Sequence, residues 1–146
     1  MAEILRVENL KTYFKLYEGL VKAVDGISFA VNEGEVLGIV GESGSGKSMT
    51  CRSILRLIPE PGEIVEGSIF YKDQNIMKWS EPRLNEYRGK EVSMILQEPM
   101  TALNPVWTVG DQMIETLMEH EGLSQAEAKN RSIELLRMVG IPVPER

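Results

Sequence analysis

The sequence predicts an α/β fold in which β-strands come first and helices come last. Two observations support this prediction: a strand pattern and a continuous apolar run precede a glycine-rich loop, and helical periodicity follows the loop. The chain has 146 residues, of which 42% are hydrophobic and 26% are charged. This is the composition of a globular protein, and the length suits one domain of ordinary size.

The first third of the chain is expected to form strands. Apolar residues occupy alternate positions over much of 21–31, which is the period of a half-buried strand, and 4–10 shows a weaker version of the pattern. A turn signal at 32–35 leads into the apolar run 36–40. Because this run has no polar face, it is typical of a strand buried on both sides, as in a helix-covered parallel sheet.

A helix is expected directly after the glycine-rich loop. Cys51, Ile54, Leu55 and Ile58 are spaced to share one helix face, and Pro59 stops the pattern. We therefore expect Cys51 to be a buried, unreactive thiol on this face.

The second half of the sequence alternates short elements before it becomes helical. We expect a short strand at 67–71, a short helix at 80–87, a second buried strand at 92–96, a loop near Pro99 to Pro105, and helices at 109–119 and 125–139. Ser124 and Glu127 form a capping-box pattern for the last helix, and Gly140 ends it.

The charge and cysteine counts exclude several classes of protein. Sixteen basic and 22 acidic residues give a net charge of −6, which disfavours binding to nucleic acid or to an anionic membrane. A single cysteine allows no internal disulfide. No signal-peptide pattern and no apolar run long enough to span a bilayer are present, so we expect a soluble intracellular polypeptide.

Residues 41–48 carry the clearest chemical signal in the chain. They read Gly-Glu-Ser-Gly-Ser-Gly-Lys-Ser and match the phosphate-binding loop Gly-x-x-x-x-Gly-Lys-Ser/Thr. Glycines let successive backbone N–H groups surround an anion, and the following helix N-terminus adds attraction for phosphate. Lys47 supplies a charge for the β- and γ-phosphates, and Ser48 offers a hydroxyl to Mg²⁺. The predicted nucleotide-binding residues are Gly41, Ser43, Gly44, Ser45, Gly46, Lys47, Ser48 and Met49.

Gln97 is a second candidate because it directly follows the apolar run 92–96. A glutamine at the carboxyl end of a buried strand faces the ligand crevice of an open α/β sheet, although a strand-end glutamine by itself is usually a solvated loop residue. There it could bind Mg²⁺ and orient an attacking water. Lys47 and Gln97 are thus the candidate catalytic residues. A GTPase is disfavoured because no Asn-Lys-x-Asp guanine motif occurs.

With these residues the chain resembles the ATPase subunits of ABC transporters. The resemblance makes Gln97 the Q-loop glutamine and Phe14 the aromatic residue that stacks on adenine, with Tyr13 and Tyr17 close enough to compete for that role. Residues 94–105, together with the preceding Arg88-Gly89, look like the oligopeptide and dipeptide importer ATPases and their nickel-importing relatives.

The resemblance implies a P-loop NTPase fold of the ABC nucleotide-binding type, with an N-terminal antiparallel β subdomain. Residues 1–99 would be the N-terminal part of the nucleotide-binding core, and 100–146 would be the Q-loop exit and the start of the helical subdomain. No signature motif and no Walker B strand ending in Asp-Glu are found, and the only histidine, His120, is expected to be a solvated helix residue. The expectation is an N-terminal portion truncated within the helical subdomain, inactive alone and with apolar surface exposed.

For the intact family protein, the resemblance implies an ATPase subunit that drives peptide uptake. ATP and Mg²⁺ would be its ligands, with Ser48 and Gln97 at the metal. Its partners would be a second ATPase subunit and membrane permease subunits, with no role for nucleic acid, and it would lie peripherally on the cytoplasmic side of the membrane. Residues 100–107 are either a permease contact or ordinary packing. The alternatives are another ABC system, such as nickel uptake, and a non-catalytic nucleotide-binding fragment.

Overall fold

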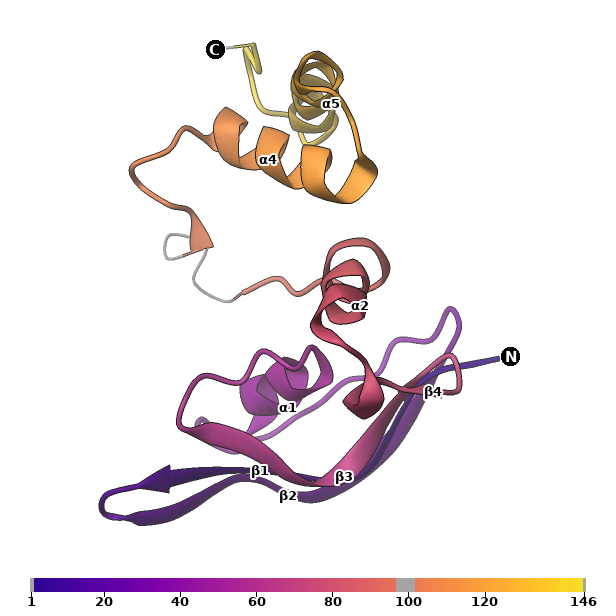
Figure 1. Ribbon diagram of the computed structural model, residues 1–146, viewed down its shortest axis with the longest axis vertical. Helices are drawn as coiled ribbons and strands as arrows, with labels where there is room; N and C mark the ends of the chain where they lie inside the picture. The colour runs from indigo at the N-terminus through magenta and orange to yellow at the C-terminus, as the bar shows by residue number, and fades with distance from the viewer. Residues whose placement is uncertain (1, 97–101, 146) are drawn as a thin grey trace. The chain divides into compact units, whose positions relative to one another are not determined.

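The structure is a computed structural model that describes residues 2–96 and 102–145. The chain divides into two compact units, Met1–Arg88 and Gly89–Arg146. The first unit contains a β-sheet with helices α1 (Lys47–Ile54) and α2 (Glu81–Glu86), and the second contains helices α4 (Val109–Glu121) and α5 (Gln125–Met138) (Figure 1). In the described part of the chain, no helix has both the length and the apolar character needed to cross a membrane. The predicted site residue Gln97, together with Pro99 and Met100 of the predicted loop and contact segment, lies outside the described residues.

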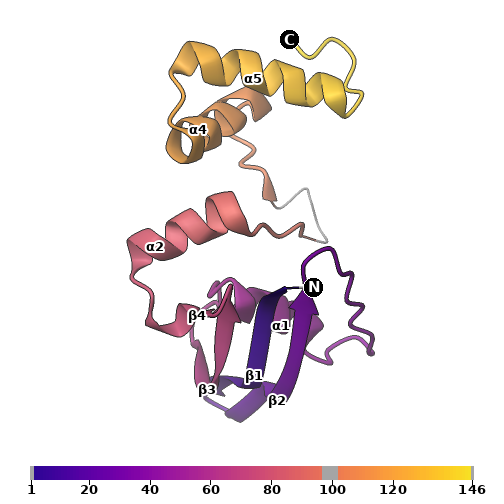
Figure 2. The same cartoon turned by 90° about the vertical axis from the view of Figure 1, so that its right-hand side faces the viewer.

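The sheet of the first unit is antiparallel and has the strand order β2-β1-β3-β4 (Figure 2). Its strands are β1 (Glu3–Leu16), β2 (Gly19–Asn32), β3 (Gly62–Tyr71) and the two-residue β4 (Gln74–Asn75). The predicted strands near 4–10, 21–31 and 67–71 are confirmed, and each of them is longer than expected. The N-terminal antiparallel β portion of the predicted fold is therefore present.

A bulge in β2 changes which side chains face the interior. Leu10 of β1 pairs with Ile27, whereas the next β1 residue pairs with Asp25, so Gly26 is the extra residue and has a φ of +81°. Beyond the bulge Ile27 is half-buried as predicted, but before it the buried residue is Val24. The alternation predicted from sequence is thus correct only on one side of Gly26, because one inserted residue reverses the parity.

The two faces of β1 have different partners. On the inner face Thr12 is fully buried, and its hydroxyl lies 2.8 Å from the hydroxyl of Ser53 in α1. On the outer face the Lys11 ammonium pairs with the Glu66 carboxylate of β3 at 2.6 Å. Helix α1 therefore covers the inner face of the sheet (Figure 1).

Helix α1 (Lys47–Ile54) is shorter than predicted, and the predicted apolar face is only partly buried, with Leu55 buried and Ile54 half-buried. Thr50 and Ser53 are buried, while Cys51 is exposed, so the prediction of a buried Cys51 is wrong. The buried side of α1 carries the hydroxyl groups of Thr50 and Ser53, and Cys51 lies outside it. The helix ends where Arg56 adopts a left-handed φ of +52°.

The two apolar runs that were predicted to be buried strands are irregular and exposed. Val36 and Val40 are 95% and 96% exposed, and Ile95 is 97% exposed. A central parallel strand requires hydrogen-bonding neighbours on both sides. Within residues 2–96 and 102–145 no strand pairs with either run, so neither run forms a strand or becomes buried.

A connecting segment closes the core of the first unit. The short 3₁₀ helix η1 (Ile76–Lys78) is followed by α2 (Glu81–Glu86) and by the π-helical turn η2 (Tyr87–Glu91), which reaches into the second unit. Helix α2 agrees with the short helix predicted here, with Ser80 as its N-cap. The buried apolar side chains of this unit are those of Val7, Leu10, Val24, Leu55, Ile69, Tyr71, Ile76, Leu84 and Tyr87.

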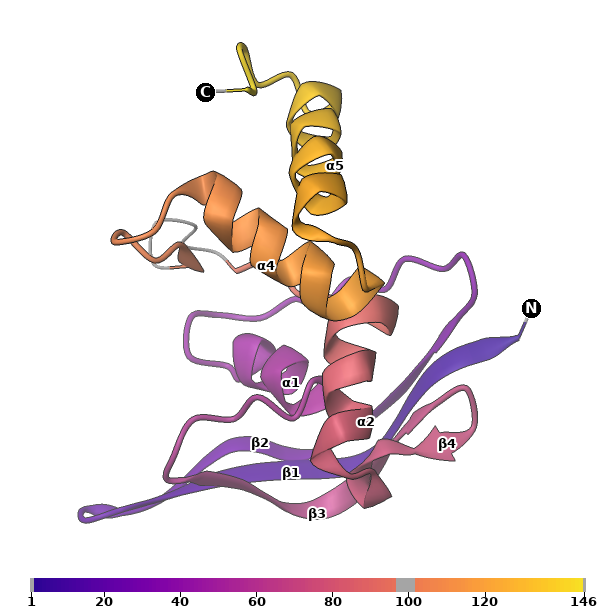
Figure 3. The ribbon, with the colours of Figure 1, turned by 45° about the horizontal axis from the view of Figure 1, so that its top comes forward.

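The second unit is built on α4 (Val109–Glu121) and α5 (Gln125–Met138), which cross each other in Figure 3. Both helices were predicted, and the Ser124–Glu127 capping box is confirmed in both of its hydrogen bonds. Gly140 adopts a φ of +79° after α5, as expected for a helix-ending glycine. His120 lies in a helix as predicted, but it is half-buried against Gly89 instead of fully solvated.

Candidate functional site

The glycine-rich loop 41–48 connects the exposed run 36–40 to helix α1. Gly44 and Gly46 have φ values of +82° and +91°, a conformation that favours glycine. The Ser45 N–H donates a 3.2 Å hydrogen bond to the Glu42 carbonyl, which closes a turn inside the loop. Residues 41–45 and 48 are exposed, so the loop is accessible to a ligand.

Two of the loop glycines lie close to neighbouring atoms, Gly46 to strand backbone and Gly41 to a side chain. A Cβ added to Gly46 would lie 2.2 Å from the Ala23 carbonyl oxygen of β2. A Cβ added to Gly41 would lie 2.5 Å from the Ser45 hydroxyl oxygen. The loop is therefore compact and packs directly on the sheet, where a side chain at Gly46 would push it away.

Lys47 folds back over the loop that precedes it. Its ammonium donates hydrogen bonds to the Gly41 and Glu42 carbonyls at 2.8 and 2.7 Å and to the Ser45 hydroxyl at 3.3 Å. These three acceptors are uncharged, and hydrogen bonds from an ammonium to phosphate oxygens are stronger. The lysine is thus held at the loop and can transfer its donors to an anion bound there.

The first turn of α1 presents unused backbone donors. Gly46 is the N-cap residue, and no side chain caps the helix. In the part of the chain that the structure describes, the N–H groups of Lys47, Ser48 and Met49 have no hydrogen-bond partner. These groups and the helix dipole attract an anion, so Met49 contributes through its backbone. Ser43, Gly44 and Ser45 surround the same end of the helix.

The hydroxyl of Ser48 fits a magnesium ligand. It is exposed on the first turn of α1 and makes no hydrogen bond to another described residue. Among residues 2–96 and 102–145 there is no cluster of His, Cys, Asp or Glu that could hold a metal by itself. Mg²⁺ typically binds few protein groups and completes its coordination with phosphates and water, which agrees with this donor set.

The structure separates the three aromatic candidates for a base-stacking role. Phe14 is half-buried on the inner face of β1, where its ring lies over Gly62 and beside Ile58. Tyr13 is on the outer face, and Tyr17 is fully exposed at the β1–β2 turn. Of these three aromatic residues, Phe14 is the one that shares a sheet face with α1 and the glycine-rich loop 41–48.

Tyr13 is engaged in interactions within the sheet. Its hydroxyl donates a hydrogen bond to Asp25, and the Lys22 ammonium lies 5.4 Å from the centre of its ring. The hydrogen bond to Asp25 raises the pKa of the Tyr13 phenol and lowers the pKa of the Asp25 carboxyl. Tyr13 is therefore committed to the outer face of the sheet.

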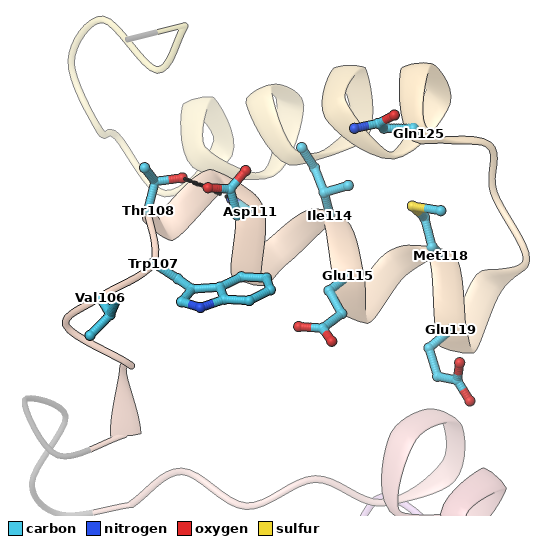
Figure 4. A pocket seen from close by; sticks show the side chains of 9 residues that line it. All are labelled: Val106, Trp107, Thr108, Asp111, Ile114, Glu115, Met118, Glu119 and Gln125. Atoms are coloured by element: carbon cyan, nitrogen blue, oxygen red, sulfur yellow. Dashed lines mark hydrogen bonds between the residues drawn. The ribbon is translucent and has the colours of Figure 1, made fainter.

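Apart from the loop 41–48, a surface hollow of about 800 Å³ lies on the second unit (Figure 4). Its apolar lining includes Trp107, Ile114 and Met118. Its charged lining is acidic and comes from Asp111, Glu115 and Glu119, which follow one another at every fourth position of α4. The described residues that line this hollow include no basic side chain, so it is unsuited to phosphate and suits a cationic, partly apolar surface. The acidic row was not predicted, although its spacing of four residues is visible in the sequence.

Comparison with known proteins places the chain in a family. The model of the ABC transporter family matches residues 24–145. The oligopeptide transport ATP-binding protein OppD of Bacillus subtilis (strain 168) is 46% identical over 100% of this chain and 41% of its own length. The dipeptide transport ATP-binding protein DppD of Escherichia coli (strain K12) is 43% identical over 97% of this chain and 43% of its own length. The chain thus spans less than half the length of these curated relatives.

Solved structures support the same fold. The dimeric structure of MJ0796, a bacterial ABC transporter cassette, superposes with a TM-score of 0.78 at 23% identity, over 92% of this chain and 56% of that one. A post-hydrolysis state of MJ0796 bound to ADP and Pi also gives a TM-score of 0.78, at 24% identity. The predicted fold and the predicted resemblance are both confirmed. The chain belongs to the ABC transporter family and has the fold of its ATP-binding cassettes.

Proposed function

We propose that this chain forms the nucleotide-binding part of the ATP-binding subunit of an ABC importer for peptides. The observation that supports this most directly is the loop 41–48, where Lys47 and the free N–H groups of the first turn of α1 converge on one exposed site. The peptide assignment rests on the relatives, which are named oligopeptide and dipeptide transport ATP-binding proteins.

In this proposal each site residue has a defined task toward ATP. The N–H groups from Ser43 to Met49 bind the phosphates, and Lys47 moves its donors from the loop carbonyls to the β- and γ-phosphate oxygens. Ser48 and Gln97 hold Mg²⁺, and Gln97 also orients the attacking water. Bound Mg²⁺ neutralises charge on the phosphates. Phe14 stacks on adenine from the inner face of β1.

We also propose partners and a cellular location for the subunit. We assign 1–99 to the nucleotide-binding core and 100–146 to the helical subdomain. ATP binds between this subunit and a second ATPase subunit, and the pair contacts permease subunits from the cytoplasmic side of the membrane. The hollow lined by Trp107 and the acidic row of α4 supports a permease contact at the second unit, because it suits a basic, partly apolar surface.

A binding experiment with a lysine variant tests the nucleotide site. Calorimetry would measure the dissociation constant of Mg-ATP for the full chain, for Lys47→Ala and for the control Lys129→Ala, which removes an exposed lysine of α5. Lys47→Ala should weaken binding by about 10- to 100-fold, since it removes charge-assisted hydrogen bonds to phosphate. The control should bind like the unaltered chain. Equal affinity of Lys47→Ala and the unaltered chain would refute the proposed site.

A further inference from the structure

The end of α1 opposite the phosphate loop is held by two neighbouring side chains. The Tyr87 hydroxyl donates to the Ile54 carbonyl at 3.2 Å. The Arg88 guanidinium donates through Nε to the Leu55 carbonyl at 2.8 Å and through Nη2 to the Arg56 carbonyl at 2.9 Å. One guanidinium thus bridges two successive carbonyls at the end of the helix.

These contacts complete the hydrogen bonding of the helix end. The last turn of a helix leaves four carbonyls without intrahelical partners. Backbone N–H groups after the helix satisfy the carbonyls of Cys51, Arg52 and Ser53. The next three carbonyls, of residues 54–56, are the ones that Tyr87 and Arg88 reach. A cation at this end also complements the helix dipole.

The Arg88 side chain is also held by contacts to residues outside α1. Its guanidinium lies 3.3 Å from the Glu81 carboxylate and 3.4 Å from the Asn85 side-chain oxygen, and only 18% of its side chain is exposed. The adjacent Tyr87 is fully buried, and its ring packs edge-on against Tyr71 and Trp79. Arg88 therefore holds α1 from a rigid support.

Polar contacts help to position α1 along its length. Thr50 and Ser53 are its buried residues and Cys51 is exposed, while the apolar Leu55 is buried just after the helix ends. It is held at Gly46 by close packing, at Ser53 by a hydroxyl pair and at its end by Arg88. With eight residues the helix is about 12 Å long, so a tilt at one end displaces the N–H groups at the other.

We propose that Arg88 is a positioning residue for phosphate binding, which acts through α1 and does not touch the ligand. It fixes the carboxyl end of α1, so that the N–H groups of the first turn and Lys47 are held toward the phosphates. The inference rests on the proposed function, because it assumes that the loop 41–48 binds a nucleotide.

The test compares ligands with and without a base. Dissociation constants for Mg-ATP and for inorganic tripolyphosphate would be measured for the unaltered chain, Arg88→Met, Arg88→Lys and the control Arg131→Met, which removes an exposed arginine of α5. Circular dichroism would confirm that each variant is folded at the temperature of measurement. Arg88→Lys keeps the positive charge but loses the planar guanidinium that donates to two carbonyls at once. Its dissociation constants therefore test the proposal even where Arg88→Met does not fold.

We expect Arg88→Met to weaken the binding of ATP and of tripolyphosphate by the same factor, about fivefold to tenfold. The affinities of Arg88→Lys should lie between those of Arg88→Met and the unaltered chain. A role in stability alone would lower the melting temperature and leave both dissociation constants unchanged, and that result would overturn the inference. Failure of the unaltered chain to bind either ligand would overturn the proposed function and this inference with it. The two failures are therefore distinguishable.

Discussion

Replacing Gly46 by alanine tests whether the phosphate loop depends on its contact with the sheet. Gly46 has a φ of +91°, and an added Cβ would lie 2.2 Å from the Ala23 carbonyl oxygen. The left-handed backbone costs an alanine about 1–2 kcal/mol. Because the obstacle is strand backbone and not a flexible side chain, overpacking should add about 1–3 kcal/mol. We expect Gly46→Ala to lower the free energy of unfolding by about 2–5 kcal/mol, the sum of these two costs.

Gly44 is the matched control for this prediction. Its φ is +82°, but no atom lies within 4 Å of an added Cβ. Gly44→Ala should therefore carry only the backbone cost of about 1–2 kcal/mol. Urea unfolding followed by circular dichroism would give the midpoints and slopes for both variants and the unaltered chain.

Binding data would complete this test. Gly46→Ala should also weaken tripolyphosphate binding, because relief of the contact moves the start of α1 away from Ala23. If Gly44→Ala and Gly46→Ala lost the same stability, the contact between the loop and the sheet would have no energetic weight, and our reasoning would be refuted.

Three further predictions concern single side chains of the sheet. Phe14→Ala should weaken ATP binding and leave tripolyphosphate binding unchanged, with Tyr17→Ala as the control, because Phe14 alone shares a face with the loop. Thr12→Val should lower the free energy of unfolding by about 1 kcal/mol, measured in urea, since it removes a buried hydroxyl bonded to α1. The Lys11 ammonium lowers the pKa of the Glu66 carboxyl, so this pair stabilises the fold above the ordinary glutamate pKa of about 4.3 and stops doing so as pH falls through the lowered value. Glu66→Gln should therefore reduce the fall in melting temperature between pH 7 and pH 3.

Each of these three predictions has a result that would contradict it. Equal loss of ATP affinity in Phe14→Ala and Tyr17→Ala would remove Phe14 from the base site. An unchanged urea midpoint in Thr12→Val would mean that its hydroxyl bond makes no net contribution to stability. If the melting temperature fell equally between pH 7 and pH 3 in Glu66→Gln and in the unaltered chain, the pair with Lys11 would make no contribution to acid sensitivity.

Local signals in the sequence predicted the helices of the second unit well. The bounds of α4 and α5 agree with expectation within two residues at each end. The capping box of Ser124 and Glu127 and the helix-ending Gly140 explain this success, because they act between neighbouring residues. Helix α2 was also predicted, as a short helix with a proline in its first turn.

Apolar periodicity was less reliable where burial depends on distant partners. The runs 36–40 and 92–96 have the composition of central strands, but in the described residues they have no strand neighbours and are irregular. The prediction for Cys51 was wrong for a related reason, since the side of α1 that meets the sheet carries Ser53, whose hydroxyl lies next to that of Thr12, and not Cys51. The bulge at Gly26 reversed the alternation of β2 without any change in composition.

The sequence by itself was enough to propose a phosphate-binding site. The spacing of glycines, Lys47 and Ser48 matches a phosphate-binding loop, a motif that depends on backbone conformations and side chains within eight consecutive residues. It also determined the family, through motifs that are contiguous along the chain.

Only the tertiary structure decided which of Tyr13, Phe14 and Tyr17 shares a face with the loop, because that depends on strand parity and on where α1 docks. It alone revealed that Arg88 grips the far end of α1, a contact between residues more than 30 positions apart. Such contacts follow from the path of the chain in space, which no local pattern of residues encodes.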